Sequence, residues 1–224
     1  MIWTIIGLFG DGEYISALCI IFAEIFILFT SFPVHECAHA WAAYKLGDDT
    51  ARLKGRLTLS PMAHLDLIGT LMILFLGVGF AKPVPVNIRN FKNRKRDFAL
   101  TSLAGPVSNL IMAFLFFVIS NVFDLFSSQI CYILSYFFYY VGYINVCLAV
   151  FNLLPVPPLD GSRIATAILP DKYYYTIMKY ERYIMIGLFV LLMSRAVSGV
   201  LSTVYGWVAD GVQFLADLPF RLIG

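Results

Sequence analysis

The feature that most restricts this chain is a series of apolar stretches, each about as long as a helix needs to cross a lipid bilayer. A spanning helix takes about 20 apolar residues, and four stretches approach or exceed that length: 15–32, 99–123, 130–154 and 183–207. Only 13% of the residues are charged, whereas a soluble domain averages about 25%. We therefore expect an all-α, multi-pass integral membrane protein, built as a bundle of four to five transmembrane helices in contact with the bilayer.

A fifth apolar stretch, 67–80, is too short for an ordinary span and predicts a re-entrant segment. Basic residues are frequent both before it, in 45–56, and after it, in 82–96. Short basic loops favour the cytoplasm, so a segment with two cytoplasmic flanks enters the membrane and returns on the same side. The alternative is a short, complete span, which would leave one basic loop on the outer side. With the re-entrant topology, the first long helix ends at the cytoplasm, where Gly47 is expected to cap it.

Two other features carry less functional information. The basic run RNFKNRKR at 89–96 is better explained as the topology signal than as a nucleic-acid site, so we expect no nucleic-acid partner. The four cysteines lie inside apolar stretches without paired spacing. We interpret them as small buried apolar side chains rather than as disulfides or a CxxC site.

The stretch PVHECAHAWAAYKLG, 33–47, places ionisable groups at the cytoplasmic end of the first apolar helix. His35 and His39 are four residues apart, so both imidazoles project from one face of a helix, about 6 Å apart along its axis. That spacing lets them bind one zinc ion, and Glu36 beside them can polarise a water molecule. An isolated core histidine paired with a carbonyl is the alternative, but it does not account for two histidines and a carboxylate together. Ionisable groups at membrane depth are costly and usually functional.

Two histidines leave a catalytic zinc ion short of a third protein ligand. The remaining candidates are His64 and a few acidic residues near the membrane, and Asp160 is the best of these. It lies in NLLPVPPLDGSR, 152–163, where prolines end a helix at the same cytoplasmic depth. Its neighbour Gly161 permits a tight backbone, although Asp-Gly is also an ordinary turn. Cys37 is expected to point away from the ligand face.

Four motifs occur together and in this order: HECAH (35–39), GFAKPVPVN (79–87), AGPVSN (104–109) and NLLPVPPLDG (152–161). The combination resembles the site-2 proteases, which are intramembrane zinc metalloproteases, and specifically the compact branch that lacks a PDZ or CBS domain. The match covers about residues 33–163.

The resemblance implies a role for each residue that matches a family motif. His35, His39 and Asp160 would bind one zinc ion per chain, and Glu36 would be the catalytic base. Asn109 and Asn152 would hold the substrate or stabilise the reaction intermediate.

The expected reaction is hydrolysis of a peptide bond in or near a transmembrane segment of a single-span membrane protein. Glu36 takes a proton from water and later gives it to the departing amine. The substrate helix must unwind first, and its free backbone groups then need partners. The segments ARLKGRLTLS, 51–60, and AKPVPVN, 81–87, are predicted to be extended, so we expect small membrane-associated strands that pair with the substrate. The former is the stronger candidate, since Pro83 and Pro85 confine the latter to an edge.

The whole chain, 1–224, is expected to form one membrane-embedded metalloprotease domain. The catalytic core covers about 14–170, and a C-terminal helix and tail occupy 180–224, with an amphipathic interfacial tail at 209–224. The expected location is a prokaryotic cell membrane, with the active site near the cytoplasmic face.

Two other classes of protein remain as alternatives. A membrane metal-binding or metal-transport protein would need polar groups across the bilayer, yet 99–123 and 130–151 contain few. An inactive scaffold would not need Glu36 beside both histidines. The sequence gives no indication of the oligomeric state.

Overall fold

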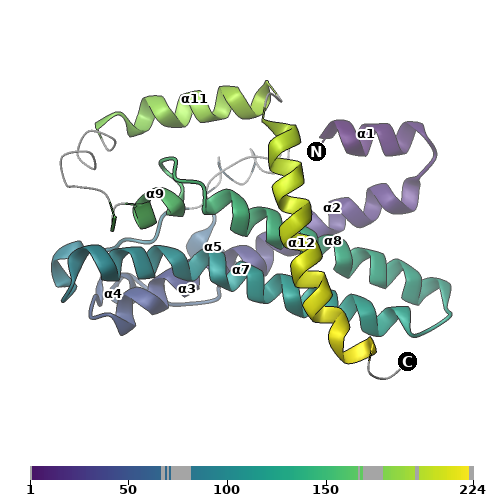
Figure 1. The fold of residues 1–224 in the computed structure, drawn as a ribbon, viewed down its shortest axis with the longest axis horizontal. Coiled ribbons are helices and arrows are strands. Elements are labelled where there is room, and N and C mark those ends of the chain that lie inside the picture. Colours follow the sequence, from purple (N-terminus) through teal and green to yellow (C-terminus); the bar gives the residue numbers. More distant parts are fainter. Residues whose placement is uncertain are drawn as a thin grey trace.

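The computed structural model describes residues 2–66, 69, 71, 82–165, 167–168, 179–194 and 197–221, and none of these residues forms a β-strand. The predicted all-α class is therefore confirmed for the described part of the chain. The helices, labelled as in Figure 1, are α1 (Ile2–Gly10), α2 (Tyr14–Phe29), α3 (Ser31–Lys45), α4 (Thr50–Leu53), α5 (Pro61–His64), the short 3-10 helix η1 (Ile88–Asn90), α7 (Arg94–Asp124), α8 (Gln129–Asn152), α9 (Asp160–Ala165), α11 (Glu181–Met193) and α12 (Ser198–Arg221).

Three of the helical stretches that the structure describes are long and apolar enough to cross a membrane: Tyr14–Lys45, Arg94–Asp124 and Gln129–Asn152. They correspond to the first three predicted spans. The first is bent between α2 and α3 at Thr30, because Pro33 lacks an amide proton and its ring would clash with the carbonyl four residues earlier.

Local sequence determines where the two helices that carry the site begin and end. At the end of α3, the Gly47 amide donates to Tyr44 O (3.1 Å) and the Asp48 amide to Ala43 O (2.9 Å). Gly47 has φ +106°, so this is a Schellman motif and the predicted cap is confirmed. At the start of α7, Asn93 accepts from the Arg96 amide, and Asp97 accepts from the Asn93 amide. This reciprocal cap sets the beginning of α7.

Helices α7 and α8 form a long antiparallel hairpin, on which α2, α3, α9 and α12 pack (Figure 1). Helix α3 lies along the first half of α7, and α2 contacts α8. On the other side, Ala209 and Ala216 of α12 pack against Ala113, Phe117 and Val146 of the hairpin. Figure 1 shows α3, α4 and α9 gathered at one end of this bundle, where α7 begins and α8 ends.

The predicted fourth span, 183–207, is wrong as one continuous helix. Helix α11 ends at Met193, and a new helix, α12, begins at Ser198 and runs in a different direction (Figure 1). The 13 residues of α11 reach only about 20 Å, less than the bilayer core. Residues 209–221 of the predicted interfacial tail continue α12, which runs without a break from Ser198 to Arg221.

The structure also differs from the expectation of two extended segments. Residues 51–53 belong to α4, and Gly55 at φ +68° begins a turn. Residues 82–87 are irregular. Their two prolines have no amide proton to donate, and the Arg56 guanidinium donates hydrogen bonds to the carbonyls of Lys82 and Pro83. The prediction of small strands is thus wrong for the described part of these segments.

The predicted re-entrant segment 67–80 lies outside the described residues, apart from two isolated positions. The four cysteines are free thiols as expected, although only Cys19 is fully buried.

Candidate metal centre

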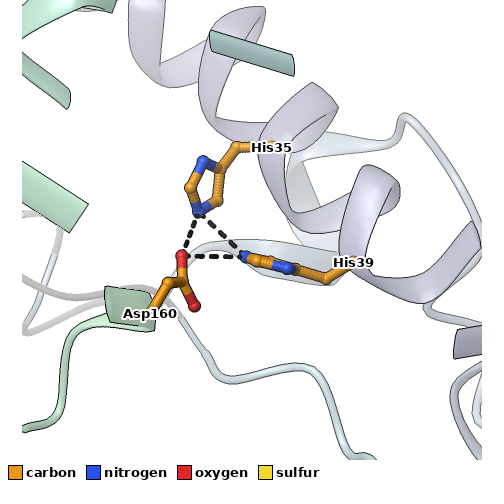
Figure 2. Close-up of side chains that lie close together, drawn as sticks. All are labelled: His35, His39 and Asp160. Carbon is orange, nitrogen blue, oxygen red and sulfur yellow. Dashed lines mark hydrogen bonds and ion pairs between the residues drawn. The ribbon is translucent and has the colours of Figure 1, made fainter. Parts of the chain in front are cut away.

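Two helix ends bring three metal-ligating side chains together. His35 and His39 project from α3, and Asp160 stands at the start of α9 (Figure 2). The two Nε2 atoms are 3.1 Å apart, and Asp160 Oδ2 lies 3.3 Å from His35 Nε2 and 3.2 Å from His39 Nε2. All three residues are buried, and they form the group of His, Cys, Asp and Glu residues able to hold a metal ion in the part of the chain that the structure describes. Cys37 is not part of it.

The His39 ring is held in the orientation that a ligand needs. Its Nδ1 lies 2.8 Å from the carbonyl oxygen of Thr101 in α7. A carbonyl only accepts, so Nδ1 carries the proton and the Nε2 lone pair is free for a metal. Metal-binding histidines are commonly oriented by such a second hydrogen bond.

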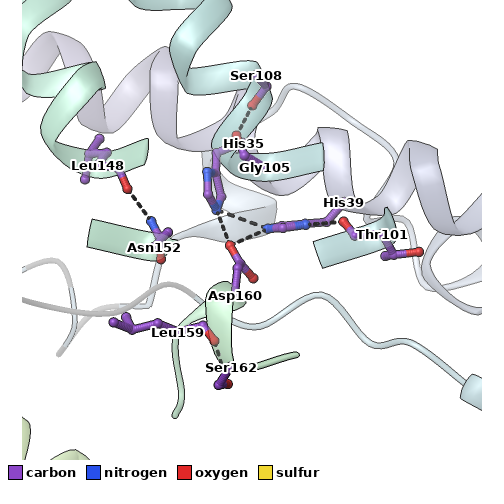
Figure 3. Close-up of polar contacts among 10 residues, drawn as sticks. All are labelled: His35, His39, Thr101, Gly105, Ser108, Leu148, Asn152, Leu159, Asp160 and Ser162. Carbon is purple, nitrogen blue, oxygen red and sulfur yellow. Dashed lines mark hydrogen bonds and ion pairs between the residues drawn. The ribbon is translucent and has the colours of Figure 1, made fainter. Parts of the chain in front are cut away.

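Gly105 allows α7 to approach the two imidazoles closely. A Cβ atom at this position would clash with Nε2 of His39 and would lie 2.6 Å from Cε1 of His35. The absence of a side chain at position 105 therefore keeps the space between α7 and the ligand atoms. Figure 3 shows Gly105 next to His35, with the Ser108 hydroxyl bonded to its carbonyl.

A compact turn after α8 places Asp160. Gly161 packs so closely that a Cβ atom there would clash with the carbonyl oxygens of Leu153 and Leu154. The turn is therefore folded back on the end of α8, as the prediction from Gly161 requires. Burial acts to raise the pKa of the Asp160 carboxyl, but the charges and hydrogen bonds of His39 and His35 outweigh it and hold the pKa below its usual range. The carboxylate is thus ionised and available as a ligand.

The three ligand atoms match a zinc site better than a set of hydrogen bonds. Zinc binds imidazole nitrogen and carboxylate oxygen at about 2.0–2.2 Å, so two ligands of a tetrahedral ion stand about 3.3–3.5 Å apart. The three observed separations, 3.1–3.3 Å, are close to this value. Two imidazoles that bind zinc through Nε2 carry no proton there, so in that state hydrogen bonds cannot account for the three contacts. A single cation between the three atoms accounts for them.

Glu36 follows His35 in α3 and is buried. Its charge acts on the guanidinium of Arg56, a residue that is also buried. Burial lowers the pKa of Arg56, and the carboxylate of Glu36 counteracts this shift. Arg56 also holds the chain at 82–83 through the two carbonyls described above, and its Nη2 lies 3.4 Å from Nδ1 of His64. The third histidine is therefore part of this buried cluster, whereas the metal-ligating group consists of the other two with Asp160.

The two asparagines assigned from the resemblance lie in different surroundings. Asn152, the last residue of α8, is partly accessible, and its Nδ2 donates to the carbonyl of Leu148 (2.9 Å, Figure 3). Asn109 is only 1% exposed, so contact between its side chain and a polypeptide would require α7 to separate from its neighbours.

Three residues that support the centre are not predicted from the sequence: Thr101, Gly105 and Arg56. Gly105 has a detectable signal, since a small residue inside an apolar helix often marks a close helix contact. Thr101 contributes its backbone carbonyl, which any residue could supply. Arg56 is hidden among the other basic residues of its loop.

Comparisons with known proteins agree with this geometry. The family described as Peptidase family M50 matches residues 23–194. The Bacillus subtilis protein named "Putative zinc metalloprotease YwhC" is 43% identical over 201 residues, which is 88% of this chain and 92% of that protein. Rip2 of Mycobacterium tuberculosis, which has the same designation, is 27% identical over 89% of this chain and 78% of its own length. "Zinc metalloprotease MJ0392" of Methanocaldococcus jannaschii is 28% identical over 70% of this chain and 37% of its own length. No solved structure matches the chain.

Proposed function

This chain belongs to peptidase family M50 and is a site-2-protease-like intramembrane zinc metalloprotease, and from this premise we propose that it cleaves single-span membrane proteins in or near their transmembrane segment. The observation that carries the proposal is the convergence of His35, His39 and Asp160 at one end of a bundle of membrane-spanning helices. A metal centre at that position can act on a peptide bond that lies within or beside the bilayer.

We assign the zinc ligands to His35, His39 and Asp160, with a fourth position left for water or substrate. A zinc ion held there would lower the pKa of a water molecule and polarise a carbonyl oxygen. Glu36 would take the proton of the attacking water and give it to the departing amine. Asn152, at the end of α8, is the more accessible of the two asparagines and can donate to the developing oxyanion.

The proposed topology places the metal centre at the cytoplasmic face of a prokaryotic cell membrane. Exposed basic residues at 94–96 stand at the start of α7, about three turns before Gly105. Short basic loops favour the cytoplasm, and this end of the bundle also carries α3, α4 and α9 (Figure 1). Within this topology the chain forms one domain with four to five membrane-inserted helices.

A metal-transport function is not favoured. Transport requires metal-ligating groups along a path across the bilayer, whereas the second half of α7 packs through phenylalanines and its Ser120 and Asn121 are bonded to neighbouring helices. The three ligands are instead concentrated at one depth.

The decisive experiment compares purified wild-type protein with Glu36→Gln in detergent. We expect about one zinc ion per chain in both proteins, and cleavage of a model transmembrane peptide only by the wild type. The matched control is Glu181→Gln, a carboxylate at the start of α11 far along the chain, which is expected to retain both properties. Glu36→Gln protein that still cleaves the peptide would contradict the assignment of the base, and zinc uptake into vesicles by this variant would favour transport.

A further inference from the structure

The two metal-ligating histidines differ at the nitrogen that faces away from the metal. His39 Nδ1 has the carbonyl of Thr101 as its acceptor. His35 Nδ1 is buried and has no hydrogen-bond partner among the described residues. A histidine that binds zinc through Nε2 carries its proton on Nδ1 and needs an acceptor for it.

The packing of α3 on α7 indicates which residues stand one helical turn beyond His35. The two helices run antiparallel, since His39 contacts Thr101 and His35 contacts Gly105. One helical turn from His35 towards the start of α3 is Ser31, and one turn from Gly105 towards the end of α7 is Asn109. Because the helices are antiparallel, these two residues are expected to face each other one turn away from the metal centre.

The packing of α7 on α8 adds a third residue at the same level. Ser120 bonds to Ser135, and Gly142 lies against the carbonyl of Ala113. Continued along this antiparallel hairpin, the same register brings Asn145 opposite residues 109–110.

Each of the three helices thus supplies one sealed polar side chain at a single level. Ser31 and Asn145 are 0% exposed, and Asn109 is 1% exposed. Three atoms have no hydrogen-bond partner among the residues that the structure describes: Oγ of Ser31 and Oδ1 of each asparagine. The amide of Asn145 donates to the Val141 carbonyl, so its orphaned oxygen can only accept. Unpaired polar atoms inside a membrane protein are costly.

We propose that Ser31, Asn109 and Asn145 form a buried water-binding site that supplies the missing acceptor for His35 Nδ1. A water molecule accepts from His35 Nδ1 and from the Ser31 hydroxyl and donates its two protons to the asparagine oxygens, so its hydrogen-bonding pattern complements all the orphaned groups. Side chains that are this deeply sealed are not open to a polypeptide in this structure. The three residues are positioning residues for a metal ligand, and the proposal rests on the role of His35 as a zinc ligand.

The direct test is nuclear magnetic resonance of the zinc-loaded protein with ¹⁵N-labelled histidine. The chain has only three histidines, and His64→Gln leaves the signals of the metal-ligating pair. We expect a magnetisation-transfer peak to water from the Nδ1 proton of one histidine and none from the other, because His39 is bonded to Thr101. Water peaks from both protons, or from neither, would overturn the proposal. A wild-type protein that binds no zinc would overturn the proposed function together with it.

A second test measures zinc affinity by competition with a chelator. Asn109→Leu and Ser31→Ala are each expected to weaken zinc binding about tenfold, as loss of an outer-shell partner commonly does. Ser108→Ala is the matched control, because the Ser108 hydroxyl is bonded to Gly105 O within its own helix, and its zinc affinity is expected to be unchanged. Affinities within twofold of the wild type in both Asn109→Leu and Ser31→Ala would contradict the proposal even if zinc binding by the wild type is normal.

Discussion

Two buried aspartates in this protein illustrate how a structural carboxylate differs from a metal-binding one. Asp48, just after α3, is 0% exposed and accepts four hydrogen bonds: from the amide and hydroxyl of Thr50, the amide of Asn87 and the side chain of Asn90. Asp160 is also buried, but it faces two imidazole nitrogens that are themselves ligand atoms.

The pKa of both carboxyls lies below the usual range, for different reasons. In each case burial acts to raise the pKa. For Asp48, hydrogen bonds from Thr50, Asn87 and Asn90 reverse this effect, whereas for Asp160 the neighbouring histidines do so. A carboxylate whose oxygens all accept hydrogen bonds, like Asp48, stabilises a loop. A carboxylate that faces other potential metal ligands, like Asp160, indicates a cation site.

Replacement of the metal-binding aspartate has the largest expected effect. Asp160→Asn removes the charged ligand, so zinc content should fall well below one ion per chain and peptide cleavage should fall to background. The matched variant Asp48→Asn should retain zinc. Zinc per chain, measured by atomic emission on both proteins, checks this contrast, and equal zinc losses would show that the two carboxylates do not differ in this way.

The close approach of α7 at Gly105 gives the next largest effect. Gly105→Ala places a methyl group against Nε2 of His39, whereas Gly142→Ala places one against the Phe117 ring, far from the centre. Overpacking should lower the free energy of unfolding by about 1–3 kcal/mol in both. Only Gly105→Ala should also lose zinc affinity. Chelator competition and thermal denaturation on both variants separate the two effects, and normal zinc affinity in Gly105→Ala would contradict the proposed role of position 105.

Asp48 is expected to contribute to stability in a pH-dependent manner. Asp48→Asn should cost about 1.5–3 kcal/mol at pH 7, since hydrogen bonds to a charged group are lost. Because the folded pKa lies below the ordinary value of about 3.9, the stabilisation is complete above that pH and is lost as the pH falls through the folded pKa.

Denaturation of zinc-free wild type and Asp48→Asn between pH 7 and pH 3 measures this difference. The gap between the two proteins should narrow on the acidic side. A gap that is constant over this range would show that the charge of Asp48 is not the source of the stabilisation.

The smallest effect is expected at Arg56. Arg56→Lys keeps the charge but loses the fork that binds the carbonyls of Lys82 and Pro83 together. We expect a loss of about 1 kcal/mol and faster hydrogen exchange at amides in 84–91, with zinc content unchanged. Exchange rates equal to those of the wild type would show that the guanidinium does not hold this segment.

The sequence alone was sufficient to predict the metal-ligating residues, the first three spans and the end of α3, because each depends on a local sequence pattern. The HECAH spacing and the Asp160–Gly161 pair predicted the three side chains that the structure brings together. The first three spans followed from hydropathy, and the end of α3 from Gly47.

Features that depend on packing between distant segments were not predictable in this way. The break between α11 and α12 lies between Met193 and Ser198, where the sequence has Ser194 and Arg195; these polar residues interrupt the apolar stretch, but the length of the stretch predicted one continuous span. The prediction of extended segments was wrong because Arg56 binds the Pro83 carbonyl and Asp48 accepts from the Asn87 amide. In a sheet, these backbone groups would pair with a neighbouring strand. Thr101 acts through its backbone carbonyl, which leaves no trace in the residue type.

The most direct test of the central claim is X-ray absorption at the zinc edge of the purified wild-type protein. Coordination by His35, His39 and Asp160 predicts one zinc ion with two imidazole ligands, the remaining ligands being oxygen at about 2.0–2.2 Å. A sulfur ligand at about 2.3 Å, a third imidazole or the absence of bound zinc would contradict it.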